Sequence, residues 1–111
     1  MYIIANMRVI YEWTHHVRAK MRQYRISESL AKRIIRHPAR VEEGVSEHTA
    51  ASMQKAGAKK SHEVWVMHRK TGSKILVISA WRYPGTSPVG KPIAIPDDVQ
   101  DAIRALADHE I

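Results

Sequence analysis

Residues 62–69 and 74–82 are two runs rich in β-branched and aromatic side chains, and the segment Lys70-Thr71-Gly72-Ser73 separates them. Two such runs around a short turn that contains glycine are typical of a β-hairpin. The centre of the second run is apolar without interruption, which indicates a strand covered by helices on at least one face. We therefore expect the second run to lie in the middle of a sheet.

Two helices are predicted before this hairpin. Thr14 is a good N-cap for a helix over about 15–24, whose apolar side chains recur at helical spacing. Ser27 caps a second helix, which Pro38 ends, and its apolar stripe is Leu30, Ala31, Ile34 and Ile35. Because only two or three residues connect the helices, we expect an antiparallel helical hairpin with its basic side chains outward.

The remaining strand signals complete an α+β fold. Residues 7–12 contain Val, Ile and Tyr and predict a strand, and residues 40–43 and 49–54 are weaker strand candidates. We therefore predict an α+β domain over residues 1–83, in which the helical hairpin packs on a mostly antiparallel sheet of four or five strands.

The last part of the chain reads as a linker and a helix. Residues 84–95 are rich in proline and glycine and predict an extended linker. Pro96 and Asp97 open a helix over residues 96–111, whose apolar stripe is Val99, Ala102, Ile103 and Leu106. This acidic helix must bury its stripe either on its own domain or on a second copy, which would give a homodimer.

Composition narrows the class of protein. The 111 residues suffice for one domain with one core, and the absence of cysteine excludes a disulfide framework and thiolate metal sites. No apolar run approaches the ~20 residues that span a bilayer, and the first residues lack the layout of a signal peptide. We therefore expect an unprocessed cytoplasmic protein without membrane contact. No cofactor motif and no metal-ligand spacing is present in the sequence.

The positive charge is concentrated in one part of the chain. Residues 14–40 hold eight basic residues against Glu28 alone, which is the whole net charge of +7, whereas residues 96–111 are acidic. This asymmetry predicts a basic face that binds a polyanion, with RNA as the first choice. A merely solubilising surface is the alternative. The predicted nucleic-acid-binding residues are Arg18, Arg22, Arg25, Arg33, Arg36, Arg40 and Tyr24.

The segment from His16 to Ser27 resembles a bacterial family of unknown function whose pattern runs His-Ala-x-x-Arg-Met-x-x-Arg-Gly-Ile-Ser. The stretch His37-Pro38-Ala39-Arg40-Val41-Glu42-Glu43 fits the end of that family's second helix and the acids after it. Lys20, Tyr24 and Arg25 depart from the pattern. The order of strand, basic helical pair and antiparallel meander resembles the RelE/ParE toxin fold, and the similarity covers about residues 8–83.

This resemblance implies a ribonuclease-type fold whose members bind RNA or a protein target. Metal-independent RNA cleavage needs a base, an acid and cations around the phosphorane. His16 and Lys20 lie four residues apart on one helix face, and Arg82 and Tyr83 end the last strand, where related toxins often place functional residues. Our hypothesis is that His16 is the acid or base, that Lys20 and Arg82 hold the phosphate, and that Tyr83 or Tyr24 stacks on a base.

Each of these side chains also has a structural interpretation. His16 can hydrogen-bond a neighbouring strand, Tyr24 can belong to the core, and Trp65 and Trp81 can be the structural aromatics of the sheet. At the level of function, the alternative to an RNA-binding protein or ribonuclease is a non-catalytic interaction module. In that module the basic hairpin binds an acidic segment, either from an antitoxin-like protein or from the C-terminal helix itself. A structural dimer without affinity for polyanions is the third possibility.

Overall fold

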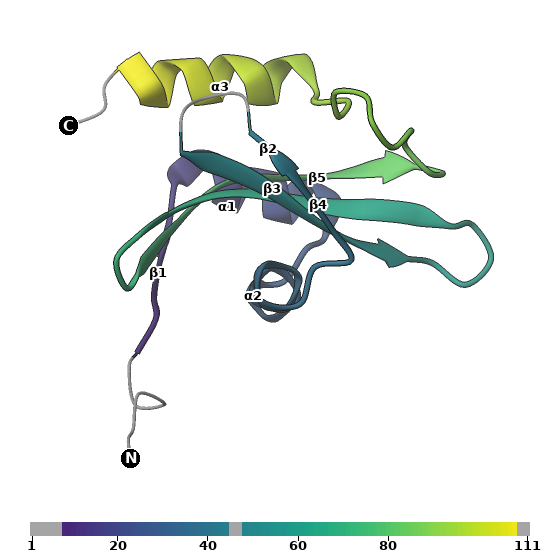
Figure 1. The fold of residues 1–111 in the computed structure, drawn as a ribbon, viewed down its shortest axis with the longest axis horizontal. Coiled ribbons are helices and arrows are strands. Elements are labelled where there is room, and N and C mark those ends of the chain that lie inside the picture. The colour runs from purple at the N-terminus through teal and green to yellow at the C-terminus, as the bar shows by residue number, and fades with distance from the viewer. Residues whose placement is uncertain (1–7, 45–47, 109–111) are drawn as a thin grey trace.

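The computed structural model describes residues 8–44 and 48–108, which form one sheet and three helices (Figure 1). The elements in chain order are β1 (Ile10–Trp13), α1 (His15–Tyr24), α2 (Glu28–Arg36), β2 (Arg40–Glu43), β3 (Thr49–Ala56), β4 (His62–Thr71), β5 (Lys74–Pro84) and α3 (Asp97–Asp108). The sheet order is β1-β5-β4-β3-β2, and only the β1–β5 pair is parallel. The prediction of an α+β fold with a mostly antiparallel sheet is confirmed.

The predicted β-hairpin is β4 and β5, with Gly72 at a φ of 61° in the turn between them. The central strand of the five is β4, and β5 lies beside it with β1 on its other side. The second run, β5, is therefore an interior strand of the sheet, as expected, but the central position belongs to the first run, β4. Both faces of β4 are buried, because Val64 and Val66 alternate with Trp65 and Met67 along it.

This alternation gives the sheet two cores, one on each face. One core joins the sheet to the first two helices through Val17, Met21, Ala31, Ile34, Val64, Val66 and Val77. The other core lies under α3 and contains Trp65, Trp81, Met67, Val99 and Ile103. The rings of Trp65 and Trp81 stack with centroids 6.3 Å apart, and each residue is 1% exposed, so both are structural aromatics.

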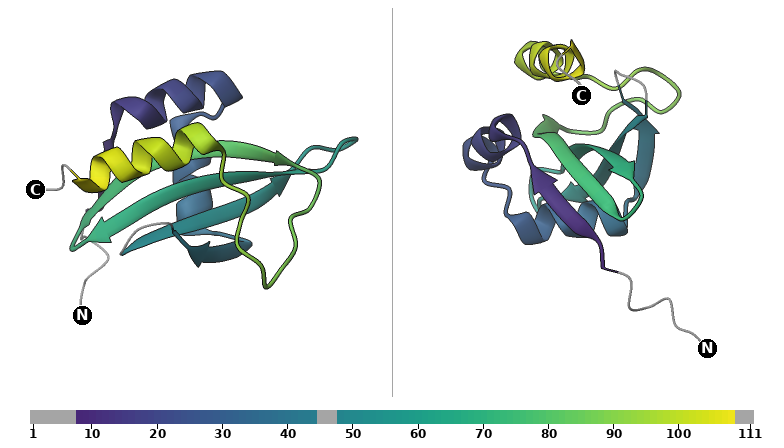
Figure 2. Two further views of the ribbon diagram at one scale, coloured as in Figure 1. Left: turned by 90° about the horizontal axis from the view of Figure 1, so that it is seen from above. Right: turned by 90° about the vertical axis from the view of Figure 1, so that its left-hand side faces the viewer.

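The two basic helices are not an antiparallel hairpin, and that prediction is wrong. Figure 1 looks along α2 whereas α1 lies across the view, so the helices are steeply inclined to each other (Figures 1 and 2). The reason is that they pack against different parts of the sheet. α1 packs on β5, and α2 packs on β3 and β4. At the start of α1, the Thr14 hydroxyl accepts a hydrogen bond from the Val17 N–H and donates one to the Ile78 carbonyl.

The change of direction between the helices is made at Arg25, which adopts a left-handed conformation with a φ of 57°. The Ile26 N–H then bonds the Met21 carbonyl at 2.8 Å, which is the usual way to close the last turn of a helix. Glycine is the residue best suited to this conformation, and glycine stands at this position in the pattern that the segment resembles. An arginine here costs about 1 kcal/mol of strain.

The segment after β5 is anchored to the sheet rather than free. Ser87 is 3% exposed, and α3 buries Val99 and Ile103 on the sheet of its own chain (Figure 2). Of the two places predicted for the acidic helix, its own domain is therefore the one that it occupies here. Within residues 8–44 and 48–108, no helix combines the length and the hydropathy needed to cross a bilayer.

Candidate nucleic-acid interface

The eight basic residues between 14 and 40 do not share one surface. Lys20 is 8% exposed and its ammonium group pairs with the carboxylate of Asp98 on α3. It also donates a 3.0 Å hydrogen bond to the Gln23 side chain. A cation that is buried and paired in this way is not available to a phosphate unless α3 moves. The observation also shows that the acidic C-terminal helix contacts the basic helix α1.

Arg40 lies on the face of the sheet that α3 covers, and it belongs to a buried polar network. Its guanidinium donates to Glu42, to the Ser87 hydroxyl at 2.8 Å and to the Pro88 carbonyl at 2.9 Å, and it stands 5.3 Å from the Trp65 ring centroid. Its side chain is 12% exposed. The arginine therefore fastens the segment after β5 to the sheet, away from the other predicted phosphate contacts.

The centre of this network is Glu63, a carboxylate with no exposed surface. The Ser87 hydroxyl and N–H donate to it at 2.6 and 3.0 Å, and the Trp65 indole donates at 3.0 Å. Burial alone would raise the pKa of Glu63, but these hydrogen bonds and the charge of Arg40 together hold the pKa below its ordinary value. Glu63 is therefore a charged structural residue of the interior.

Arg82, proposed for phosphate binding, closes the end of α1. Its guanidinium donates to the carbonyls of Tyr24 at 2.7 Å and Arg25 at 3.1 Å, and to the His62 ring at 2.7 Å. These are carbonyls that a helix end leaves without partners. Tyr83 and Tyr24 are both partly buried against the core under α3. The structure thus gives Arg82, Tyr83 and Tyr24 internal contacts in place of an open site.

His16 lies near the start of α1, and its Nε2 is 2.8 Å from the hydroxyl of the buried Ser79. Burial lowers the pKa of His16 below its ordinary value, and the positive charge of Lys20 lowers it further. His16 is therefore a neutral imidazole at pH 7 that is bonded to the neighbouring strand. This is the structural interpretation of the residue, although a neutral imidazole can also accept a proton.

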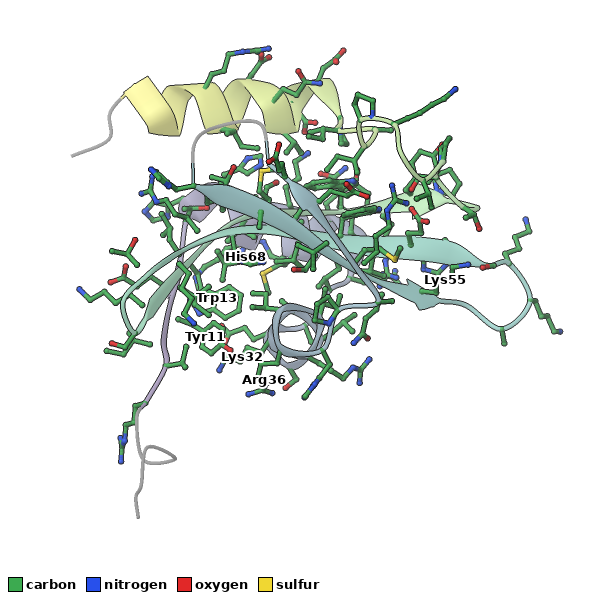
Figure 3. All side chains as sticks on the ribbon, in the orientation of Figure 1. Tyr11, Trp13, Lys32, Arg36, Lys55 and His68 are labelled. Atoms are coloured by element: carbon green, nitrogen blue, oxygen red, sulfur yellow. The ribbon has the colours of Figure 1, made fainter. Side chains whose placement is uncertain are left out.

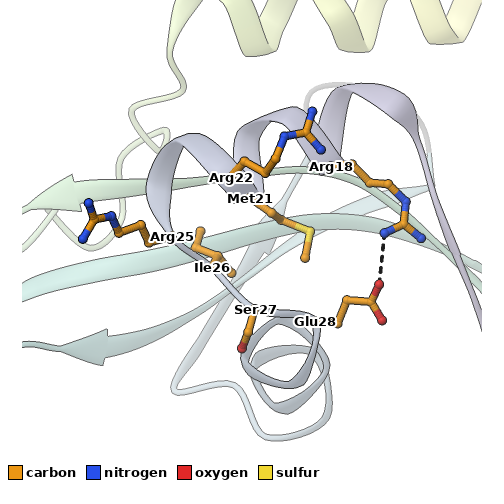
Figure 4. A pocket seen from close by; sticks show the side chains of 7 residues that line it. All are labelled: Arg18, Met21, Arg22, Arg25, Ile26, Ser27 and Glu28. Atoms are coloured by element: carbon orange, nitrogen blue, oxygen red, sulfur yellow. Dashed lines mark hydrogen bonds and ion pairs between the residues drawn. The ribbon is translucent and has the colours of Figure 1, made fainter.

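Three of the predicted arginines line one hollow at the junction of α1 and α2, with their guanidinium groups pointing in different directions (Figure 4). Arg18, Arg22 and Arg25 line an open hollow of about 430 Å³, with Met21 and Ile26 beneath them (Figure 4). Arg18 bonds Glu28 at 3.0 Å, but both side chains are nearly half exposed, so this pair adds little stability. No hydrogen bond or ion pair joins the side chains of Arg22 or Arg25 to any residue in the described part of the chain.

The first turn of α2 forms the other wall of this hollow. The Ser27 hydroxyl accepts a hydrogen bond from the Leu30 N–H, and Ser27 and Glu28 both line the hollow. A helix start carries a partial positive charge, which adds to the field of the arginines. Three arginines against one glutamate leave an excess of two positive charges in a concave site. This is the arrangement that favours a phosphate group.

An aromatic ledge adjoins the hollow, and sequence reasoning missed it. Tyr11 and Trp13 on β1 stack with centroids 6.2 Å apart and an interplanar angle of 25°, and both rings are partly buried against the core under the first two helices. Arg18 stands 5.7 Å from the Trp13 centroid, and Lys32 stands 5.1 Å from the Tyr11 centroid (Figure 3). The available signal was the alternation Tyr11-Glu12-Trp13, which places both rings on one face of a strand.

The two remaining predicted contacts, Arg33 and Arg36, are exposed on α2. Arg33 donates a long 3.4 Å hydrogen bond to Gln54, and Arg36 lies beside a cavity between α2 and β1. The cations of α2 thus extend the basic surface from the hollow towards β1. Among the described residues, no cluster of three or more His, Asp or Glu side chains is placed to hold a metal ion.

Comparisons of the chain with protein-family models, with curated proteins and with solved structures find no match. The resemblance to the RelE/ParE toxin fold therefore stays a prediction that rests on the residues quoted above.

Two half-buried histidines, His16 and His68, predict a specific dependence of stability on pH. Burial lowers the pKa of His68 as well as that of His16. Both imidazoles therefore bind protons more strongly in the unfolded chain than in the folded protein. The unfolded chain then binds more protons than the folded one, and the free energy of unfolding falls as the pH drops below about 6.5. Urea unfolding between about pH 7.5 and 5.5 measures this slope.

The test variant combines His16→Gln with His68→Gln. The control is His37→Gln, because His37 is exposed. The double variant should have a flatter slope, and the control should keep that of the wild type. A double variant with the wild-type slope would show that these two rings do not cause the pH dependence.

Proposed function

We propose that this protein binds RNA, and that the hollow between α1 and α2 holds the phosphate backbone. The observation that carries the proposal is that Arg18, Arg22 and Arg25 all line one concave surface beside the start of a helix. Arginine presents a planar fork of donors that fits a phosphate in two-point fashion. Two of the three guanidinium groups have no competing partner among the described residues.

The aromatic ledge favours a nucleic acid over a polyanion without bases. Proteins that bind single strands combine cations along the backbone with aromatic rings on which bases stack. Here Arg18 belongs to both parts, because it lines the hollow and stands over Trp13. The resemblance to the RelE/ParE toxin fold supports RNA as the nucleic acid, and the left-handed Arg25 agrees with the glycine in the pattern of the resembled family.

Cleavage of the bound RNA is the second candidate, and the half-exposed imidazole of His16, whose pKa burial lowers, is the feature that favours it. The other three proposed catalytic groups, Lys20, Arg82 and Tyr83, are held by internal contacts. Binding is therefore better supported than cleavage. A non-catalytic module that binds an acidic segment is supported by one contact, the pair of Lys20 with Asp98. That contact occupies a different face from the hollow residues Arg22 and Arg25.

The direct test is a titration of a fluorescein-labelled single-stranded RNA of about 12 nucleotides with the full chain, followed by anisotropy at about 50 mM salt. We expect saturable binding that the addition of salt weakens. Gel analysis of the same RNA after incubation in EDTA, with His16→Ala as control, tests cleavage separately. No binding at low salt would contradict the proposed function, whereas intact RNA in a saturated complex would remove only the cleavage hypothesis.

A further inference from the structure

The cavity between β1, α2 and the β4–β5 hairpin is separate from the arginine hollow. It has a volume of about 470 Å³, within the range typical of sites for small ligands. Its walls come from the β1 segment, α2 and the β4–β5 hairpin, three regions that are distant in sequence, and Figure 3 shows Tyr11, Arg36 and His68 around this region. The residues that line it are Val9, Tyr11, Ile35, Arg36, His68 and Lys70, together with Ile75.

The walls are of two chemical kinds. Val9, Ile35, Ile75 and the Tyr11 ring offer an apolar and aromatic surface, which suits a flat ring. Two exposed cations, Arg36 and Lys70, make no hydrogen bond or ion pair with any residue in the described ranges, so they are available to an anion at the rim. A ligand that fits both kinds of wall has a flat, largely apolar part and a negative group next to it.

His68 forms a neutral part of the wall. Its Nε2 is 2.9 Å from the Ser52 hydroxyl, which fixes the ring, and its Nδ1 is buried with no partner among the described residues. Because Nδ1 is buried, a ligand in the cavity meets the edge of the imidazole ring and not this atom.

The cavity is connected to the hollow by the aromatic ledge. Tyr11 lines the cavity and stacks on Trp13, and Arg18 stands over Trp13 and lines the hollow. Lys32 stands over Tyr11 at the same ledge. A strand that crosses the ledge therefore passes cations on both sides of two stacked rings, and it reaches the cavity at one end. The path therefore combines cations with aromatic rings, the two features that proteins use to bind single strands.

We propose that this cavity receives one unpaired base of the bound RNA, with Arg36 and Lys70 at the flanking phosphate. The inference rests on the proposed function and adds to it the substrate class, a single-stranded segment. Bases inside a duplex are stacked and paired, so they cannot enter a side pocket without being unpaired first. The protein should therefore prefer a single strand to the duplex of the same sequence.

Photo-crosslinking tests the placement of the base directly. A single-stranded RNA with 4-thiouridine at each position in turn is bound to the full chain, irradiated, and the crosslinked peptides are identified by mass spectrometry. We expect one position to crosslink at Tyr11 or His68. Arg36→Glu with Lys70→Glu should abolish this crosslink and lower affinity about 100-fold, because each reversal removes one phosphate contact.

The control variant is Lys59→Glu with Lys60→Glu, which makes the same change of charge at exposed residues in the loop before β4. Lys60 and Lys70 lie near opposite ends of that strand, about 30 Å apart at 3.3 Å per residue. This control should keep the crosslink and most of the affinity. A complex whose crosslinks fall only on residues that line the hollow, and on none that line the cavity, would overturn the base pocket and leave RNA binding intact. Failure of the wild type to bind RNA would overturn both proposals.

Discussion

Arg22→Glu combined with Arg25→Glu should weaken the binding of single-stranded RNA about 100-fold at low salt, roughly tenfold for each position. Both side chains are exposed at the end of α1, line the hollow and have no partner to lose among the described residues. The loss should therefore appear in affinity and not in folding. The Lys59→Glu and Lys60→Glu variant has the same net charge and should bind within about threefold of the wild type.

Arg25→Gly should raise the stability of the protein and lower its affinity for RNA. Glycine relieves the left-handed strain at this position, so the free energy of unfolding should rise by up to about 1 kcal/mol. The same change removes a guanidinium from the hollow, and RNA affinity should fall about tenfold. A more stable protein that binds RNA as well as the wild type would exclude Arg25 from the interface.

Glu63→Gln should lower the free energy of unfolding by about 3 kcal/mol, the largest effect on stability that we expect from a single polar residue. The amide has nearly the shape of the carboxylate, but its NH₂ group faces the Ser87 or Trp65 donors that the carboxylate accepts. The change also removes the negative charge of Glu63 near Arg40, which keeps only its ion pair with Glu42. Urea unfolding at pH 7 measures the loss.

Glu43→Gln is the matched control, because Glu43 is exposed on β2, the edge strand of the same sheet. It should change the free energy of unfolding by less than about 0.5 kcal/mol. The contribution of Glu63 is present above its ordinary pKa of 4.5 and is lost as the pH falls through the lower pKa of the folded protein. An equal response of the two variants would show that the Glu63 network is not a stabilising element.

Local signals in the sequence predicted most of the elements. The N-caps Thr14 and Ser27 and the stop at Pro38 gave the helices nearly to the residue, since a cap depends only on residues within one turn. The angle between the helices was not predictable in the same way. It depends on the left-handed Arg25 and on Arg82, which reaches the end of α1 from 57 and 58 residues away along the chain.

The sequence also predicts where basic residues are concentrated, but not which of them are buried. A run of basic residues predicts a basic surface, and Arg18, Arg22 and Arg25 do form one. Lys20 and Arg40 belong to the same run, but their partners Asp98 and Ser87 lie on distant segments, so their burial is a tertiary effect. No local pattern distinguishes them from the exposed cations beside them. Only the pairing of strands and helices decides which cations stay open.

The salt dependence of RNA binding tests the central claim most directly. On a single strand each phosphate that the protein neutralises contributes about 0.7 to the slope of log affinity against log salt. Three arginines at the hollow predict a slope of at least about 2 for the wild type, and one lower by about 1.4 for Arg22→Glu with Arg25→Glu. Equal slopes for these two proteins would contradict the assignment of the hollow as the phosphate site.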